Sequence, residues 1–438
     1  MSEYAVFWGC TIPARFPFIE KSTRLVLEGL GTELRTLDGH TCCPEGTLVK
    51  AHSPETFFLA AARNLALIEA AGLDVLTPCN GCYSTFKEAQ SHLSVDWRQR
   101  EAINERLATV DLKYRGRLNI YHFAEYLSDI VGDGVVASRV KRPLWGMRIA
   151  VHYGCHLLRP QPAVRWDDPL HPTKVEALIR ALGAEVIDYP SKMTCCGGAL
   201  DRVGQRDSSL AFARKKLGEL REAKADALVV VCPSCFQQFD LNQAAMVTAD
   251  DPWKLPVLYL SELIALAWGH GVDELGLGQH RVSVEPFLER LEHAAADKEH
   301  LARHFDVGLL NKCDDCRACK DDCPVAKIDA TFRPNDLIAD LVRGKMDGVV
   351  ASGEAYKCVE CYNCQELCHS RIGMTEVMRT LKEMGIARGL APEAVVTGYE
   401  TVLHTGSLGK PRAAARKKLG LGEPPLGGGN VLQELLDL

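Results

Sequence analysis

The chain has 438 residues, of which 47% are hydrophobic and 25% charged, and a formal net charge of −6 at pH 7. These values are typical of a globular protein of two or three domains; they give no reason to expect a nucleic-acid partner, and no segment approaches the roughly 20 apolar residues of a membrane-spanning helix. The N-terminus, MSEYAVFWGC, lacks the features of an export signal, so we expect a cytoplasmic protein without direct membrane insertion.

The first third of the chain alternates short apolar runs with helical patterns. YAVFWG (4–9) and LDVLT (73–77) are typical of strands, and between them lie the stretch around STRLVLEGL (22–30) and the helical run ETFFLAAARNLALIEAAG (55–72). This alternation predicts βαβ units with parallel strands.

The same rhythm returns in the next part of the chain. MRIAVHYG, KVEALIRALG, AEVIDYP, SSLAFARKKLGELREAKA and ALVVVCPS follow one another between residues 147 and 234. The segment PVLYLSELI (256–264) also resembles LNIYHFAEYL (118–127). The sequence therefore predicts two copies of one α/β domain, at 1–143 and 144–290, each with a parallel sheet.

The cysteines follow the same duplication. One set of five recurs as a second set: Cys10, Cys42, Cys43, Cys79 and Cys82 correspond to Cys155, Cys195, Cys196, Cys232 and Cys235. The first equivalent pair is 145 positions apart, whereas Cys42 and Cys195, and likewise Cys79 and Cys232, are 153 apart. In both copies cysteines follow the ends of strands. Because open α/β sheets bind ligands at the carboxyl ends of their strands, three loops per copy are expected to bring five thiolates together.

The last part of the chain looks different. The Gly-rich stretch at 269–286 suggests a domain edge, and a helical pattern follows at 286–305. Residues 295–390 read as short helices around cysteines without a strand. The tail, 391–438, contains Gly, Pro and a basic run and is expected to be loosely structured.

Eight cysteines in this part form two runs of the pattern C-x2-C-x2-C-x3-C. This is the spacing of bacterial two-cluster ferredoxins, in which the fourth cysteine of each run ligates the other cluster. It predicts two cubane 4Fe–4S clusters, one bound by Cys313, Cys316, Cys319 and Cys368 and the other by Cys358, Cys361, Cys364 and Cys323. A pair of zinc ribbons and, for an exported chain, a disulfide framework are the alternatives.

The two five-cysteine sets call for another kind of site. Adjacent cysteines, as in TCCP (41–44) and TCCGG (194–198), point thiolates in diverging directions, which suits two irons of one extended cluster better than one tetrahedral ion. Five ligands also exceed the four that a cubane takes. A zinc ion held by four of the five thiolates, or a cubane with one spare thiol, remains an alternative.

These blocks resemble a known family. GCTIPARFPFIEKSTRLVLEGLG, TCCP, CNGC, CHLLRP, CCGG and CPSC resemble the two CCG motifs in the B subunit of heterodisulfide reductase over about residues 3–290, and residues 295–425 resemble the C subunit. The resemblance implies a B–C fusion: α/β CCG domains followed by a mainly α-helical dicluster ferredoxin-like domain. It also implies that each five-cysteine set binds a noncubane 4Fe–4S cluster, and that the two clusters face each other around a disulfide such as CoM-S-S-CoB.

The resemblance also implies a division of labour. Electrons would pass through the cubane clusters to the disulfide, and two thiols would be released. No flavin or NAD fingerprint is present, because GGALDRVG (197–204) lacks the G-x-G-x-x-G spacing. Electrons are therefore expected from the family's flavin-containing A subunit, often joined to a hydrogenase or formate dehydrogenase.

Some other residues are weaker candidates. His122, His152 and His156 could supply protons, although a structural role is the simpler reading for each. Arg159, Lys192 and Arg202 could meet an anionic thiol substrate, or could be solvated surface. Two rival functions stay open: an electron-transfer subunit of a 2-hydroxy acid dehydrogenase, and a sulfur-oxidising assembly running related chemistry in the oxidative direction.

Overall fold

The computed structural model describes residues 3–246, 252–313, 316–409, 413–422 and 429–436. It divides into two compact units, Met1–Ala295 and Ala296–Leu438, which are described separately below.

The first half of unit 1 is built on a parallel four-stranded sheet. Its strands, β1 (Glu3–Val6), β2 (Glu33–Arg35), β3 (Asp74–Thr77) and β4 (Ile120–His122), lie in the order β2-β1-β3-β4. The connecting helices are α1 (Thr11–Arg15), α2 (Pro17–Gly29), α3 (Pro54–Ala70), α4 (Asn80–Val95), α5 (Trp97–Leu107), α6 (Phe123–Glu125) and α7 (Asp133–Ser138), with the shorter turns η1 (Gly46–Lys50), η2 (Ala108–Val110) and η3 (Tyr126–Val131).

The second half repeats this topology. Strands β5 (Arg148–His152), β6 (Glu185–Ile187), β7 (Ala227–Val230) and β8 (Val257–Tyr259) form a parallel sheet in the order β6-β5-β7-β8. The helices are α8 (Gln161–Val164), α9 (Lys174–Ala181), α10 (Gly198–Arg202), α11 (Arg206–Glu222), α12 (Pro233–Phe236), α13 (Asn242–Ala244), α14 (Leu260–Ala267) and α15 (Val272–Leu275), with η4 (Gln237–Leu241) and η5 (Leu277–Gln279).

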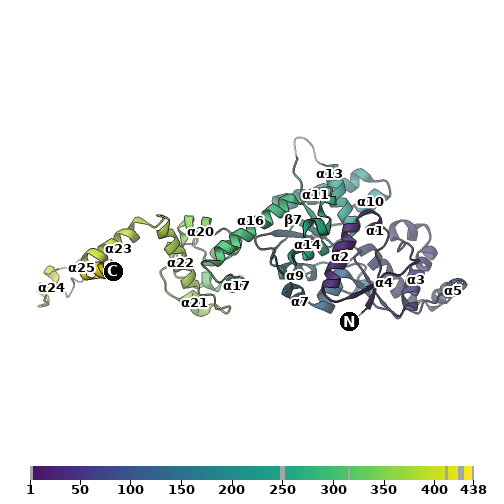
Figure 1. The fold of residues 1–438 in the computed structure, drawn as a ribbon, viewed down its shortest axis with the longest axis horizontal. Coiled ribbons are helices and arrows are strands. Elements are labelled where there is room, and N and C mark those ends of the chain that lie inside the picture. The colour runs from purple at the N-terminus through teal and green to yellow at the C-terminus, as the bar shows by residue number, and fades with distance from the viewer. Residues whose placement is uncertain (1–2, 247–251, 314–315, 410–412, 423–428, 437–438) are drawn as a thin grey trace. The chain divides into compact units, whose positions relative to one another are not determined.

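The central strands are buried on both faces, which explains their unbroken apolar sequences. Ala227–Val230 of β7 is buried throughout, as expected for a parallel strand covered by helices on both sides. The halves also pack on each other. Helix α2 of the first half lies beside α14 of the second (Figure 1), where the buried Oγ atoms of Ser22 and Ser261 are 2.8 Å apart. One continuous apolar core therefore spans both sheets.

Helix α16 (Glu285–Ala302) contains the boundary between the units. The described part of unit 2 is helical: α17 (Val307–Leu310), α18 (Ala318–Asp321), α19 (Pro334–Val342), α20 (Met346–Ser352), η6 (Glu354–Lys357), α21 (Asn363–Leu367), α22 (Met374–Ala387), α23 (Glu393–Thr405), α24 (Ala413–Lys418) and α25 (Gly429–Leu436). Its own small core contains Phe332, Ile338, Leu341, Met378 and Leu381.

The predicted fold class, two parallel α/β domains followed by a helical one, is confirmed. The tail differs from its expectation, because three helices form beyond residue 391 in the described residues; α23 has no buried residue. Within the described ranges, no helix is both long and apolar enough to cross a membrane.

Candidate metal centre in a cysteine-lined cavity

The fold places cysteines where strands give way to helices. Cys10 and Cys79 are the N-cap residues of α1 and α4, which follow β1 and β3, and Cys232 is the N-cap residue of α12, which follows β7. Parallel strands end at the same edge of their sheet, so these cysteines gather there. Cys82 and Cys235 lie one turn into α4 and α12 and are buried.

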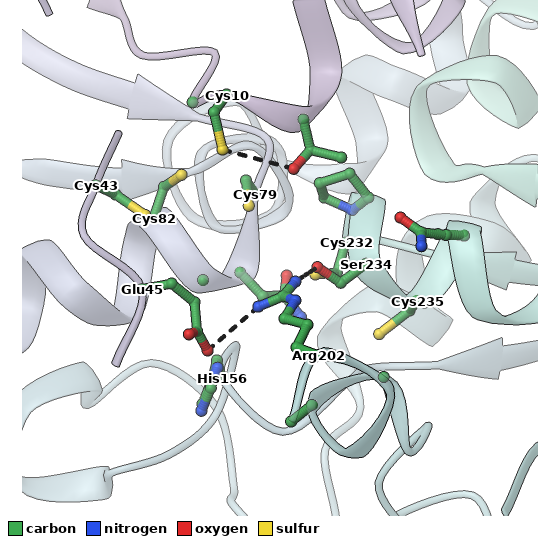
Figure 2. A pocket seen from close by; sticks show the side chains of 18 of the residues that line it. Cys10, Cys43, Glu45, Cys79, Cys82, His156, Arg202, Cys232, Ser234 and Cys235 are labelled. Carbon is green, nitrogen blue, oxygen red and sulfur yellow. Dashed lines mark hydrogen bonds and ion pairs between the residues drawn. The ribbon is translucent and has the colours of Figure 1, made fainter. Parts of the chain in front are cut away.

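All ten cysteines of the two five-cysteine sets line one cavity of about 590 Å³. Six of them are buried: Cys43, Cys79, Cys82, Cys196, Cys232 and Cys235. Cys10 and Cys42 are exposed at its edge, with their Sγ atoms 3.6 Å apart, well beyond the roughly 2.05 Å of a disulfide bond. The cavity belongs to both halves, so the thiols converge as one constellation (Figure 2).

Two glycines allow the chain to approach these thiols closely. Gly9 has a φ of +69°, and a Cβ atom there would lie 2.8 Å from the Sγ of Cys82. Its counterpart Gly154 has a φ of +72°, and a Cβ would lie 2.6 Å from Nδ2 of Asn80, which donates to the carbonyl of Tyr153. Any side chain at either position would fill space that the cysteines and their neighbours occupy.

The halves meet through equivalent residues. Cys79 and Cys232 come from the two sets, yet their side chains interact directly: Cys232 raises the pKa of Cys79, while Cys235 and Cys79 lower the pKa of Cys232. The hydroxyl of Tyr259 donates to the carbonyl of Pro78, just before Cys79. The two sets therefore meet at Cys79 and Cys232.

Neighbouring thiols strongly perturb each other in both sets. The thiol of Cys42 is the main cause that lowers the pKa of Cys43 to about 6. In the second set, Cys155 is the main cause that lowers the pKa of Cys195 to about 2, and Cys195 in turn raises the pKa of Cys196 to about 12. Thiolates must form before iron can bind, so assembly of a metal centre here must release protons.

Polar side chains bridge the two halves at the cavity wall. Nη1 of Arg202 lies 3.2 Å from the carboxylate of Glu45, and Nη2 of Arg202 donates to the hydroxyl of Ser234 (Figure 2). Arg15 donates to Oε1 of Gln237 at 3.2 Å. Arg202, one of the candidates from the sequence, thus lines the cavity.

The candidate histidines differ in their surroundings. His122 is a cap residue: its Nδ1 accepts from the amide of Ala124 at 3.1 Å, and burial lowers its pKa to about 4. His156 is exposed and lines the cavity. His152 is buried with both ring nitrogens lacking a hydrogen-bond partner among the described residues, and burial lowers its pKa to about 3.

The other two basic candidates bond to residues of the same chain. Lys192 makes ion pairs with Glu176 at 2.8 Å and Asp188 at 3.0 Å. Arg159 donates to the carbonyl of Met193 at 3.4 Å. Neither is among the residues that line the cavity, so their roles in the described structure are local packing and charge pairing.

Two residues near the site are absent from the sequence-based candidates. Asn64 bonds the loop that carries Cys42, and Lys216, fully buried, donates to the carbonyls of Ser191 and Lys192. Burial lowers the pKa of Lys216 to about 8, although nearby cysteines oppose this effect. The helical spacing of the apolar positions in SSLAFARKKLGELREAKA places Lys216 on the same face as Ala213, Leu217 and Leu220, and this is the sequence signal for its burial.

Unit 2 holds the remaining cysteines in two smaller cavities. One is lined by Cys313, Cys316, Cys319 and Cys368. The other is lined by Cys323, Cys358, Cys361 and Cys364, and also by Cys319. Cys368 thus joins the cavity of the first run and Cys323 that of the second, while Cys319 lines both.

The donor sets fit iron–sulfur clusters. Five thiols in each half of the large cavity, and four in each predicted set of unit 2, are soft sulfur ligands of the kind that these clusters use. The closely approaching Gly9 and Gly154 leave room beside the thiols that bulkier residues would remove. Ligation by the individual cysteines stays a prediction.

Comparison with known proteins agrees with this architecture. Residues 4–87 and 149–240 match the cysteine-rich (CCG) domain family, and residues 312–373 match the 4Fe-4S dicluster domain family. The chain is 35% identical over 298 residues to the B subunit of the ferredoxin:CoB-CoM heterodisulfide reductase of Methanosarcina mazei, covering 68% of this chain and 99% of that protein.

The C-terminal part has its own relative. A protein of Archaeoglobus profundus that is named for its likeness to the C subunit of heterodisulfide reductase is 28% identical over 142 residues, covering 32% of this chain and 76% of that one. A hypothetical protein from Helicobacter pylori of known crystal structure shares the fold, with a TM-score of 0.54 and 19% identity, covering 65% of this chain and 52% of that chain.

Proposed function

The chain belongs to the family of heterodisulfide reductase B subunits, continued in one polypeptide by a dicluster region like that of the C subunits, and on this premise we propose that it reduces a disulfide at two noncubane 4Fe–4S clusters. The substrate would be CoM-S-S-CoB or an analogous small disulfide. As part of an oxidoreductase, with CCG and 4Fe-4S domains, the chain has the components that this activity requires.

One observation carries the proposal: a single cavity is lined by all ten cysteines of both five-cysteine sets. A protein that only relays electrons needs clusters within tunnelling range, but not two cluster sites opening into one space large enough for a small molecule. Both sets are complete, and Cys79 meets Cys232 between them. A disulfide lying in this cavity would have one sulfur near each set.

The reaction cleaves one sulfur–sulfur bond and consumes two electrons and two protons, giving two thiols. Bound clusters would supply electrons one at a time and iron sites for the two sulfurs. The chain's residues hold the ten thiolates in place, and Arg202 with Glu45 closes part of the cavity wall between the halves. His156, exposed at the cavity, is positioned to exchange protons with solvent.

Electrons would enter through the two cubane clusters of unit 2 from a partner protein. The absence of a nucleotide-binding fingerprint in the sequence favours a flavin-containing donor like the family's A subunit, with a hydrogenase or formate dehydrogenase further upstream. A cytoplasmic complex is the setting expected from the sequence.

The proposal is tested by comparing variants of the cavity cysteines with a variant of the proposed electron-transfer clusters. Cys42→Ala and Cys195→Ala each remove a proposed ligand at the cavity and should abolish disulfide reduction even with a small, strong one-electron donor. Cys316→Ala changes only a proposed cubane ligand. It should block electron flow from the physiological partner while retaining activity with the small donor.

The comparison requires folded variants, because loss of a cluster ligand can also reduce stability. Circular dichroism and gel filtration under anaerobic conditions supply this control. Should folded Cys42→Ala and Cys195→Ala proteins reduce the disulfide as fast as Cys316→Ala does, the cavity is not the reaction site and a relay function replaces the proposal.

A further inference from the structure

The duplicated halves allow equivalent positions to be compared. Helices α3 and α11 have 17 residues each, and every buried residue of α11 has a buried counterpart in α3, 152 positions earlier. Ser209, Ala213, Lys216, Leu217 and Leu220 correspond in this way to Phe57, Ala61, Asn64, Leu65 and Ile68. Asn64 and Lys216 are therefore the same position in the two copies.

Both side chains hold the loop that leads to an adjacent cysteine pair, but with different chemistry. Nδ2 of Asn64 donates to the carbonyl of Cys42 at 3.1 Å, and its Oδ1 accepts from the amide of Thr41 at 3.0 Å. Nζ of Lys216 donates to the carbonyls of Ser191 and Lys192. A neutral amide in the first half is thus replaced by a fully buried amine in the second.

At a second pair of equivalent positions, the second half again has the more polar residue. Phe7 and His152 each precede, by three residues, the first cysteine of their set; Phe7 directly follows β1, and His152 is the last residue of the equivalent strand β5. Phe7 is apolar and packs on Phe86, with ring centroids 4.7 Å apart. A ring nitrogen of His152 and the Sγ atoms of Cys196 and Cys235 all lie within 4.8 Å of one another.

The described residues of the first half include no buried Lys or Arg, and Arg15, which lines the cavity from this half, is exposed. His40 also lies near an adjacent cysteine pair, but it packs on Phe7, and burial and Arg63 rather than a thiol perturb its pKa. Arg63 is partly exposed and donates to the carbonyl of Gly39. Solvent screens its charge far more than that of a buried amine.

Charge and N–H donors next to an iron–sulfur cluster raise its reduction potential, because they stabilise the added electron. We propose that Lys216 and His152 make the two cavity clusters inequivalent, the cluster of Cys155, Cys195, Cys196, Cys232 and Cys235 having the higher reduction potential. This inference rests on the proposed function, which places a cluster in each set.

Because the two cavity clusters differ in reduction potential, they are reduced in a fixed order. The first electron to reach the cavity resides at the second-half site, so the substrate sulfur on that side is the first to gain electron density. Lys216 and His152 are thus positioning and tuning residues, since they act through the cluster rather than on the disulfide.

The test is a potentiometric titration of the anaerobic full-length chain, followed by electron paramagnetic resonance. Iron and sulfide are measured first, so that a chain lacking the cavity clusters counts against the proposed function alone. Cys10→Ser and Cys155→Ser assign the signals to the first and second sets. Beside the signals of the two proposed cubane clusters, the two cavity clusters of the wild type should show different midpoint potentials, the higher one belonging to the second set.

Lys216→Asn, which copies the first-half residue, should lower the potential of the second-set cluster and leave the other unchanged. His152→Phe, which copies Phe7, should do the same independently, and the double variant should bring the two potentials together. Lys216→Arg should keep the wild-type value. Lys215→Asn is the matched control, because Lys215 is exposed one residue away on the same helix.

Equal potentials in the wild type would overturn the inference. So would a Lys216→Asn protein with full iron content whose two potentials are unchanged or move together. If Lys216→Asn does not retain its iron, His152→Phe decides the question, because an unchanged second-set potential in that variant overturns the inference.

Discussion

Gly9 lies so close to the Cys82 thiol that there is no space for a side chain at this position. Its positive φ alone would cost an alanine about 1–2 kcal/mol, and the added Cβ would collide with the Sγ of Cys82. Gly39 has a φ of +85°, but nothing lies within 4 Å of a Cβ there. We therefore predict that Gly9→Ala loses iron from the first set, whereas Gly39→Ala loses only backbone stability.

Iron and sulfide analysis, together with urea unfolding under anaerobic conditions, separates the two effects. The strain from positive φ should lower the free energy of unfolding similarly in both variants. Equal iron contents in Gly9→Ala and Gly39→Ala would show that Cys82 tolerates the displacement and that the close approach is unimportant.

The buried pair of His280 and Glu262 makes a prediction about pH. Their side chains are fully buried, with Nε2 of His280 2.9 Å from the Glu262 carboxylate. Burial opposes the charged imidazole, but Glu262 and then Asp240 outweigh it and raise the pKa of His280. A raised pKa in the folded state stabilises the protein fully below the unfolded value of about 6.5, and this contribution is lost as pH rises through the folded pKa.

Glu262→Gln tests this assignment, because glutamine keeps the volume and can still accept from the amide of Tyr259. The free energy of unfolding of the wild type should fall, relative to that of the variant, as the pH rises from about 6 into the alkaline range. A constant difference between the two proteins over that range would contradict a charged His280.

At the level of elements, the short helices of unit 2 set the arrangement of its cysteines. Cys319 lies in α18 and Cys364 in α21, and the fourth cysteine of each run lines the other run's cavity. Cys368→Ser should therefore alter the cluster proposed for the 313–319 run, and Cys323→Ser the cluster proposed for the 358–364 run.

Mössbauer spectra of iron-57-labelled variants measure this effect cluster by cluster. Cys316→Ser provides the reference spectrum for one cavity and Cys361→Ser for the other. A Cys368→Ser spectrum that resembles Cys361→Ser, rather than Cys316→Ser, would mean that each run keeps its own fourth cysteine.

The sequence predicts the elements that have a strong pattern of their own. Apolar, β-branched runs predict β1, β3, β5 and β7, and the rule for parallel sheets predicts that the cysteines at their ends meet. The strand β2 (Glu33–Arg35) is missed, because its short run of two exposed charged residues around Leu34 gains its strand conformation only by pairing with β1. Lys216 is missed because lysine is rarely buried, although its position in α11 lies on the apolar face of the helix.

For the whole molecule, the cysteine sets make a quantitative prediction. If every set is filled, the anaerobic chain holds about sixteen irons, four from each of four clusters. Chemical iron and sulfide analysis measures this number directly. About eight irons with stoichiometric zinc would instead mean that the five-cysteine sets are zinc sites. That result would exclude the proposed reaction at the cavity.

The duplication of one topology in a single chain also bears on how such a centre can be refined by evolution. A homodimer of identical halves would have to place the same residue beside both sites, so any mutation would alter the two together. Covalent linkage of the copies removes that constraint: Asn64 and Lys216 occupy one structural position but are encoded separately. Each substrate-facing side of the cavity can then acquire its own electronic character without a change in the shared scaffold.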